Sequence, residues 1–141
     1  MATDNGDGIV LDVERFDEDP ELEIFHGLIG DITIEGLESM GYKDWLKVAT
    51  KIVGPECLTE KMQDSILQIG KTIPSVPQLG TSANIAGSAI SFVLRKIANK
   101  ETMPSGRYFV NIEEDIESDY NSSERKEKRL KKTKMFLGQF N

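Results

Sequence analysis

The hydrophobic pattern of the chain is strongest between residues 79 and 100. The polar residues of this stretch follow one another at spacings of four, three, four and four, so they form a single stripe on an α-helix. Nearly every other position is apolar, and a helix that is apolar around most of its circumference is usually buried in its domain. We therefore predict a buried central helix, with Thr81 or Ser82 as its N-cap. The polar stripe consists of Asn84, Ser88, Ser91, Arg95 and Asn99.

Two shorter helices are predicted before the central one, each ending at a glycine. Residues 42–53 carry apolar side chains at helical spacing, and Gly54 with the proline after it ends this helix. A second helix is expected from Glu56 or Thr59 to residue 69, where Gly70 stops it. The apolar residues of the second helix, Leu58, Met62, Ile66 and Ile69, would face inward.

Two further segments are expected around these helices. Asp19 followed by proline is typical of a helix start, which predicts a short helix over residues 19–29. The alternation of Ile32 and Ile34 with polar residues predicts a short strand or an extended linker over residues 31–37.

The segments that flank the central helix are not helical in pattern. Residues 71–79 contain two prolines, which favour an extended connector or, as an alternative for residues 71–77, a basic polyproline ligand for an SH3-type groove. Residues 107–112 are aromatic and β-branched, which predicts a short strand or a docked extended segment.

The charges of the chain are divided between its two ends. Residues 1–23 carry nine acidic residues and one basic residue, a net charge of −8, whereas residues 124–134 carry seven basic and two acidic residues, a net charge of +5. The whole chain of 141 residues has a net charge of −7, which argues against nucleic-acid binding over its entire surface. Residues 1–19 have little to bury, so we expect them to be flexible.

Pattern and charge together predict a mainly α fold. We expect a small bundle of three or four helices with short β segments, formed by residues 20–112. A flexible acidic head, residues 1–19, would precede this core domain. An acidic-then-basic tail, residues 113–141, would follow it.

The sequence carries little that resembles a catalytic or metal site. The single histidine, His26, and the single cysteine, Cys57, have no partner of matching chemistry nearby in sequence, so we expect no enzyme, no cofactor and no metal. Residues 3–14 partly match a calcium-binding EF-hand loop, but Thr3 stands where the first aspartate ligand belongs. An acidic solvated segment is the favoured interpretation of this region, and calcium binding stays an alternative.

The basic tail admits three functional interpretations besides a solvated charged surface. Clustered basic residues can neutralise the phosphates of RNA or DNA, or they can form a nuclear localisation signal. With the apolar residues that follow them, they can also bind the surface of an anionic membrane. We favour nucleic acid, and RNA over DNA, and we infer that the acidic head competes for the tail. The nucleic-acid candidates are Arg125, Lys126, Lys128, Arg129, Lys131, Lys132 and Lys134.

A second group of residues is predicted to bind a protein partner. Bulky apolar side chains interleaved with acids near the first predicted helix, and the apolar end after the basic run, are typical of segments that dock onto a partner. These candidates are Leu22, Phe25, Ile29, Phe136, Leu137 and Phe140.

The sequence therefore predicts a non-enzymatic interaction protein whose helical core binds a protein partner and whose tail contacts nucleic acid. This layout of acidic head, helical core and charged tail is similar to that of viral replication and nucleocapsid accessory proteins, as an analogy of layout only. A purely protein-binding adaptor is the first alternative and a membrane-peripheral protein the second, and a homo-oligomer stays open. With one cysteine and no signal-peptide pattern, we expect a cytoplasmic location, or a nuclear one if the tail is a nuclear localisation signal.

Overall fold

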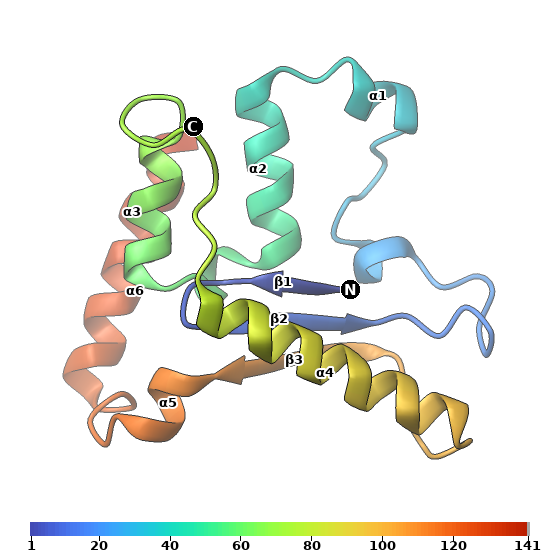
Figure 1. The fold of residues 1–141 in the computed structure, drawn as a ribbon. Helices are drawn as coiled ribbons and strands as arrows, with labels where there is room; N and C mark the ends of the chain where they lie inside the picture. The colour runs from blue at the N-terminus through green and yellow to red at the C-terminus, as the bar shows by residue number, and fades with distance from the viewer. Residues whose placement is uncertain (141) are drawn as a thin grey trace.

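The computed structural model describes residues 1–140. Three strands and six α-helices follow one another in the order shown in Figure 1, with three short 3₁₀ turns between them. The strands are β1 (Ala2–Asp4), β2 (Gly8–Val13) and β3 (Gly106–Asn111). The helices are α1 (Ile34–Glu38), α2 (Tyr42–Val53), α3 (Glu60–Gln68), α4 (Gly80–Ala98), α5 (Ile112–Ile116) and α6 (Ser123–Leu137), and the turns are η1 (Ile24–Gly27), η2 (Pro55–Cys57) and η3 (Gly138–Phe140).

One half of the molecule is an antiparallel sheet covered by α4. The strand order is β1-β2-β3, so β2 is central and pairs with a strand about a hundred residues away in sequence, in the register Ile9 to Val110. Alternate residues of β2 face α4, because successive side chains of a strand point to opposite faces. Figure 1 shows α4 lying across this face of the sheet. The buried core here consists of Ile9, Leu11, Val13, Val93 and Met103.

The other half is a cluster of three helices. α2, α3 and α6 surround a second buried core, to which α6 contributes Phe136, 2% exposed. Phe140 packs edge-on against the Phe136 ring, with the ring centroids 5.1 Å apart. Inside the cluster the Gln63 amide donates to the Leu58 carbonyl at 3.1 Å and to the Thr133 hydroxyl at 3.0 Å. The second core consists of Leu46, Leu58, Met62, Ile66 and Phe136.

An ion pair on the far face of the sheet joins the two halves. Asp12 is 2% exposed and lies opposite Arg107 in the register of β2 and β3, with Arg107 Nε 2.8 Å from Asp12 Oδ1. The same guanidinium donates to the last carbonyls of α2, to that of Ile52 at 2.6 Å and that of Val53 at 3.2 Å. A cation there also complements the negative end of the helix dipole.

The β1–β2 turn provides a second joint. The Asn5 carbonyl accepts from the Thr59 N–H at 2.9 Å, at the residue that caps α3 through its hydroxyl. Gly6 has φ of +126° and lies against Thr59, so that a Cβ on Gly6 would come within 2.1 Å of the Thr59 hydroxyl. Glycine is therefore required at this turn by both backbone conformation and space.

The predicted helical bundle with flexible ends is wrong, although helices do predominate, because both ends are part of the folded structure. Residues 1–19 contain β1 and the fully buried β2, and these two strands make up most of a three-stranded antiparallel sheet. Residues 113–141 include most of α5 and all of α6, and α6 fills one side of the second core. The error came from counting the acids of the head as solvated charges, whereas Asp12 is buried beside Arg107.

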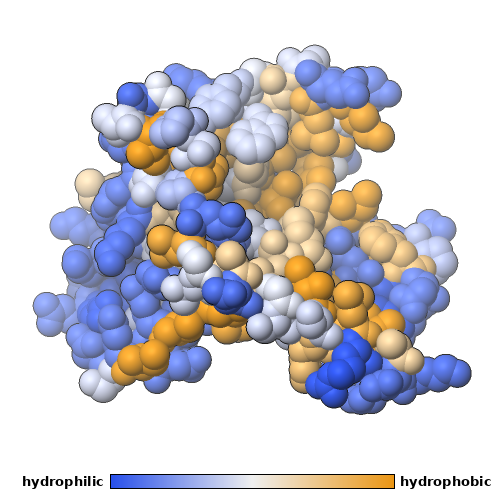
Figure 2. Space-filling model, in the orientation of Figure 1, coloured by the Kyte–Doolittle hydropathy of each residue, from blue (hydrophilic) through white to orange (hydrophobic). Residues whose placement is uncertain are grey.

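The prediction that α4 is buried nearly all round is also wrong. One stripe of α4 packs on the sheet, whereas Ile90, Phe92 and Leu94 are exposed. Figure 2 shows apolar surface over the part of the molecule where α4 lies in Figure 1. Its N-cap is Leu79, and Ser82 instead donates its hydroxyl proton to the Leu79 carbonyl at 3.0 Å.

The helix predicted over residues 19–29 does not form. Phe25 and His26 have φ of 52° and 53°, in the left-handed region, and only the 3₁₀ turn η1 occurs there. The Phe25 N–H donates to the Glu14 carboxylate, which fixes this turn to the end of β2. The strand or linker expected over residues 31–37 is α1 instead, capped by the Thr33 hydroxyl, which accepts from the Gly36 N–H.

Three helices and one strand are confirmed. α2 covers residues 42–53 as predicted, α3 follows its cap Thr59, and α4 lies within residues 79–100. β3 occupies the predicted aromatic segment, and residues 71–79 connect α3 to α4. Within residues 1–140 no helix combines the length and the apolar character that crossing a bilayer demands.

Because Phe136 is part of the second core, we expect Phe136→Ala to lower the free energy of unfolding by about 3–5 kcal/mol. The matched control is Leu137→Ala, whose side chain is 41% exposed, with an expected loss of about 0.5 kcal/mol or less. Urea denaturation followed by Trp45 fluorescence measures both. Equal losses for the two variants would contradict the placement of α6 in the core.

Candidate functional site

All seven basic residues of the predicted nucleic-acid site lie on α6. This helix begins at a Ser122 cap, whose hydroxyl accepts from the Arg125 N–H at 3.3 Å. Pairs such as Glu124 with Lys128 have the i, i+4 spacing that supports a helix. Docking on α3 then holds the helix in place through the second core.

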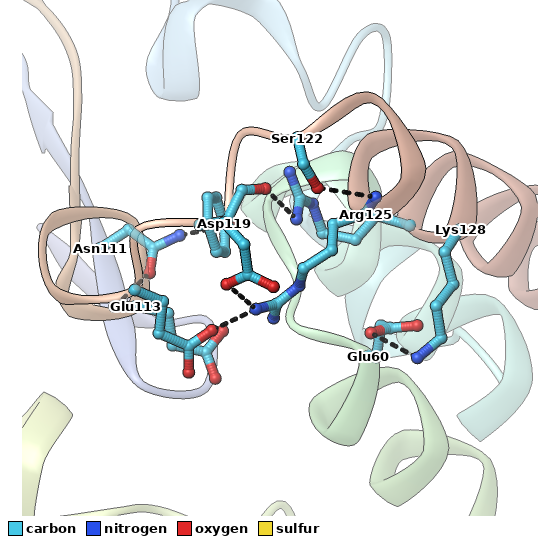
Figure 3. Close-up of polar contacts among 10 residues, drawn as sticks. Glu60, Asn111, Glu113, Asp119, Ser122, Arg125 and Lys128 are labelled. Carbon is cyan, nitrogen blue, oxygen red and sulfur yellow. Dashed lines mark hydrogen bonds and ion pairs between the residues drawn. The ribbon is translucent and has the colours of Figure 1, made fainter.

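Four of the seven bases are engaged with the rest of the chain, and Figure 3 shows two of them, Arg125 and Lys128. Arg125 contacts the carboxylates of Glu117 and Asp119, and its hydrogen bond with Glu117 raises the pKa of the guanidinium. Lys128 lies 3.9 Å from Glu60, and Lys132 lies 2.7 Å from Asp64, so α3 supplies acids to one side of α6. None of the ion pairs described for α6 involves the acidic head.

Arg129 makes two contacts with the same residue, Tyr120. Its guanidinium carbon lies 3.9 Å from the centre of the Tyr120 ring, and it donates to the Tyr120 carbonyl at 2.8 Å. The Tyr120 hydroxyl in turn accepts from the Asn111 amide at 2.7 Å, at the end of β3. Arg129 therefore anchors the loop before α6.

Three lysines of α6 remain on the surface. Lys126, Lys131 and Lys134 are exposed, and none of them forms an ion pair within residues 1–140. Leu130, on the same helix, is 57% exposed. The available part of the predicted basic site is thus smaller than its sequence suggests.

The structure separates the predicted partner-binding residues into two groups. Leu22, Phe25 and Ile29 are half-buried in and around η1, and they do not share a helical face there. At the C-terminal end Phe136 is buried and Phe140 is half-buried against it, which leaves Leu137 as the exposed member.

A cleft between α2 and α3, which sequence reasoning missed, is the most apolar concave surface described. Its volume is about 200 Å³, and β1 and Val76 close its end. At its rim Trp45, 46% exposed, stacks on Tyr42 with the ring centroids 6.2 Å apart. The lining residues are Thr3, Asp4, Trp45, Leu46, Ala49, Thr50, Val53, Leu58, Met62, Ile66 and Val76. The helical spacing of Trp45, Ala49 and Val53 is present in the sequence. The same spacing occurs in helices whose apolar face is packed in a core, so it does not indicate a cleft.

The groups that could carry chemistry are dispersed. His26 Nε2 lies 3.7 Å from Asp12 Oδ1, on the sheet face opposite α4, and Cys57 is far from it in sequence, at the end of η2. No group of three or more His, Cys, Asp or Glu side chains within residues 1–140 is arranged to hold a metal ion. The partly matching EF-hand segment forms β1, its turn and β2.

Comparison with known proteins gives a distant similarity. Over 112 residues, which are 79% of this chain, the sequence is 31% identical to the uncharacterized protein MT1398 of Mycobacterium tuberculosis (strain CDC 1551 / Oshkosh). The chain spans about 15% of the length of that curated relative. No protein-family model and no solved structure matches the chain significantly.

Cys57 should react slowly in the folded protein. Burial, with a smaller contribution from the neighbouring Glu56 carboxylate, raises the pKa of its thiol from 9.0 to about 11. Because the thiolate is the reactive species, we expect labelling by a disulfide reagent at pH 8 to be at least about tenfold slower than in urea, relative to free cysteine in the same solvents.

The same shift makes folding stability depend on pH. As the pH rises from 9.0 towards about 11, the unfolded state loses its thiol proton first, so stability decreases over this interval. Cys57→Ser should remove this part of the pH dependence in urea titrations. An unchanged dependence would contradict the burial of the thiol.

Proposed function

We propose that this chain is a non-enzymatic protein-binding domain, and that the cleft between α2 and α3 receives an apolar side chain of a partner protein. The observation that supports the proposal best is the cleft itself, lined mostly by apolar side chains and bordered by the exposed Trp45. Tryptophan at the edge of an apolar pocket is typical of the residues that dominate binding energy at protein interfaces.

The size of the cleft favours a side chain over a free small molecule. Its volume of about 200 Å³ lies below the roughly 300–1,000 Å³ of small-molecule sites. A single large aliphatic or aromatic residue of a partner would fill it and would also cover Trp45. The match to a short part of a much longer relative supports a domain that works beside other domains.

Filling the cleft tests this proposal. Ala49 lines the cleft from α2, so Ala49→Phe should occupy it with the protein's own ring and weaken partner binding at least about tenfold. The measurement is a peptide display selection against the full chain, followed by titration of the selected peptides with Trp45 fluorescence, since Trp45 is the single tryptophan.

The matched control is Lys47→Phe, which adds the same ring on the exposed side of α2. Selected peptides should share a large apolar residue, bind the control normally, and shift Trp45 emission to shorter wavelength. Peptides that bind Ala49→Phe as tightly as the unsubstituted chain would refute the assignment of the cleft.

A second candidate function is RNA binding by the outer face of α6. It rests on the three exposed lysines Lys126, Lys131 and Lys134, which can neutralise phosphates because no carboxylate of the described chain pairs with them. A chain ending at Ser123 is unsuitable for the test, since it would also lose Phe136 from the second core. Substitution on the surface avoids that problem.

The RNA candidate predicts a salt-sensitive affinity that depends on these lysines. Changing all three to glutamine should reduce the slope of log affinity against log salt for single-stranded RNA by about two. Fluorescence anisotropy over a salt series measures this slope. The same change at Lys43, Lys47 and Lys51 of α2, three exposed lysines, is the control for net charge. Equal effects of the two triple variants would indicate non-specific attraction and exclude a site on α6.

A further inference from the structure

The outer edge of β1 has no backbone partner among the hydrogen bonds described, and a cavity bordered by residues 76–78 lies beside it. Met1 accepts from the Asp12 N–H at 2.8 Å, and the Asn5 N–H donates to Gly8 at 3.2 Å. Because hydrogen bonding alternates along an antiparallel pair, the peptide groups of Ala2 and Asp4 point away from β2. No backbone hydrogen bond described outside the sheet reaches either residue. An open edge is a template for pairing with another strand.

An exposed apolar stripe of α4 runs along the same edge. Ala83, Gly87, Ile90 and Leu94 follow at spacings of four, three and four, so they share one helix face. Ala83 lines a cavity of about 430 Å³ together with β1 and residues 76–78. Ile90 and Leu94 line a second cavity, of about 160 Å³, together with Met1. Both cavities lie on the β1 side of the helix.

The stripe is complementary to itself when reversed. Its first half is small, Ala83 and Gly87, and its second half is bulky, Ile90 and Leu94, the latter 60% exposed. In an antiparallel pair of such helices, Leu94 would face Ala83 of the other copy, and Ile90 would face Gly87. Both pairings have the same midpoint, between Ser88 and Ala89, so one two-fold axis satisfies both. The larger cavity would then receive bulky side chains of the other copy.

The spacing of the elements satisfies strand pairing and helix packing together. α4 lies mainly over β1 and β2. Neighbouring strands are about 4.8 Å apart. A helix centred above the pair of β1 and β2 therefore lies half a strand spacing from β1, and a two-fold axis midway between β1 and its copy lies another half spacing beyond β1. The helix is then about 4.8 Å from that axis. Two α4 helices would thus be roughly 10 Å apart, close to the 8–10 Å of packed helices.

From these observations we propose that the chain forms a two-fold symmetric dimer with a second copy of itself. β1 pairs antiparallel with β1 of the other copy to make a six-stranded sheet, and the two α4 helices pack side by side on one face. The cleft between α2 and α3 also reaches Thr3 and Asp4 of β1, but Ala49, the residue that tests the cleft, lies on α2 and outside the proposed interface.

The dimer has one identifiable electrostatic cost. Asp4 sits on β1 close to the axis, so the interface brings two equal negative charges together, on a chain of net charge −7. Asp4→Asn should therefore tighten the dimer, and so should added salt. Non-specific association through exposed apolar residues would not change in affinity with Asp4→Asn.

Sedimentation of the full chain over a dilution series up to millimolar concentration tests the proposal. We expect a reversible monomer–dimer equilibrium that Leu94→Glu weakens at least about tenfold. Leu130→Glu on α6, at a residue 57% exposed, is the matched control and should leave it unchanged. Ala49→Phe should also leave it unchanged, which separates this test from that of the proposed function. A chain that is monomeric throughout, or equal effects at 94 and 130, would overturn the proposal.

Gly87 provides a variant that cannot act by unfolding the protein. A Cβ at this position meets nothing within 4 Å, and glycine is a poor helix former, so Gly87→Leu should not destabilise the monomer. It should nevertheless block the place that Ile90 of the other copy needs. Unchanged urea stability with a dimer weakened at least about tenfold supports the interface, and an unchanged dimer overturns it.

A disulfide trap gives an independent measurement. In a Cys57→Ser background, Ala83→Cys combined with Leu94→Cys places two thiols eleven positions apart on one helix, roughly 16 Å along its axis, too far to bond within a chain. Mild oxidation converts two thiols into one disulfide, and the reduced oxidant carries away two electrons and two protons. Covalent dimers on denaturing gels support the proposed pairing, and exclusively monomeric chains overturn it.

Discussion

The structure depends on the ion pair between Asp12 and Arg107 more than on any other single contact. Asp12 brings a charge into the middle of the sheet, where desolvation is costly unless a partner compensates it. Arg107 supplies that partner at 2.8 Å and also donates to the carbonyls of Ile52 and Val53. One guanidinium therefore compensates the charge of a strand carboxylate and donates hydrogen bonds to a helix end. Removing either charge of such a buried pair costs about 3–5 kcal/mol.

This joint also determines the shape of the candidate cleft. The end of α2 is held on the sheet by Arg107, and the start of α3 is held on the β1–β2 turn by the bond from the Thr59 N–H to Asn5. The two helices are thus fixed to neighbouring parts of one sheet, and their facing apolar surfaces leave the space that Trp45 borders. We expect the cleft to be largely preformed, because one attachment comes from strand β3 and the other from the turn that joins β1 to β2.

The elements that could be predicted from sequence are those with local signals. α2 and α3 have helical apolar spacing, a following glycine and, for α3, a hydroxyl cap at Thr59. β2 escaped prediction because its six residues are buried on both faces and lack alternation, and because acids surround them. Its partner β3 is about a hundred residues away, so no local pattern reports the pairing. A tally of charge could not distinguish the buried Asp12 from its solvated neighbours.

The same distinction applies to the candidate site. The seven bases were correctly located on one segment, but the acids that engage them, such as Glu60 and Asp64, come from a helix about seventy residues earlier. Only folding brings them together. Sequence composition therefore overestimates the free positive charge of α6 and underestimates how firmly this helix is bound to the rest of the chain.

The central helix raises the opposite problem, because its sequence is more apolar than the fold of one chain requires. A single sheet face covers one stripe of α4, and the neighbouring stripe through Ile90 and Leu94 stays in water. Exposed apolar residues are ordinary when scattered, but here they are continuous with an open strand edge. In the proposed dimer, the second copy would cover both in one interface. The prediction of a buried helix would then describe the associated protein more accurately than the isolated chain.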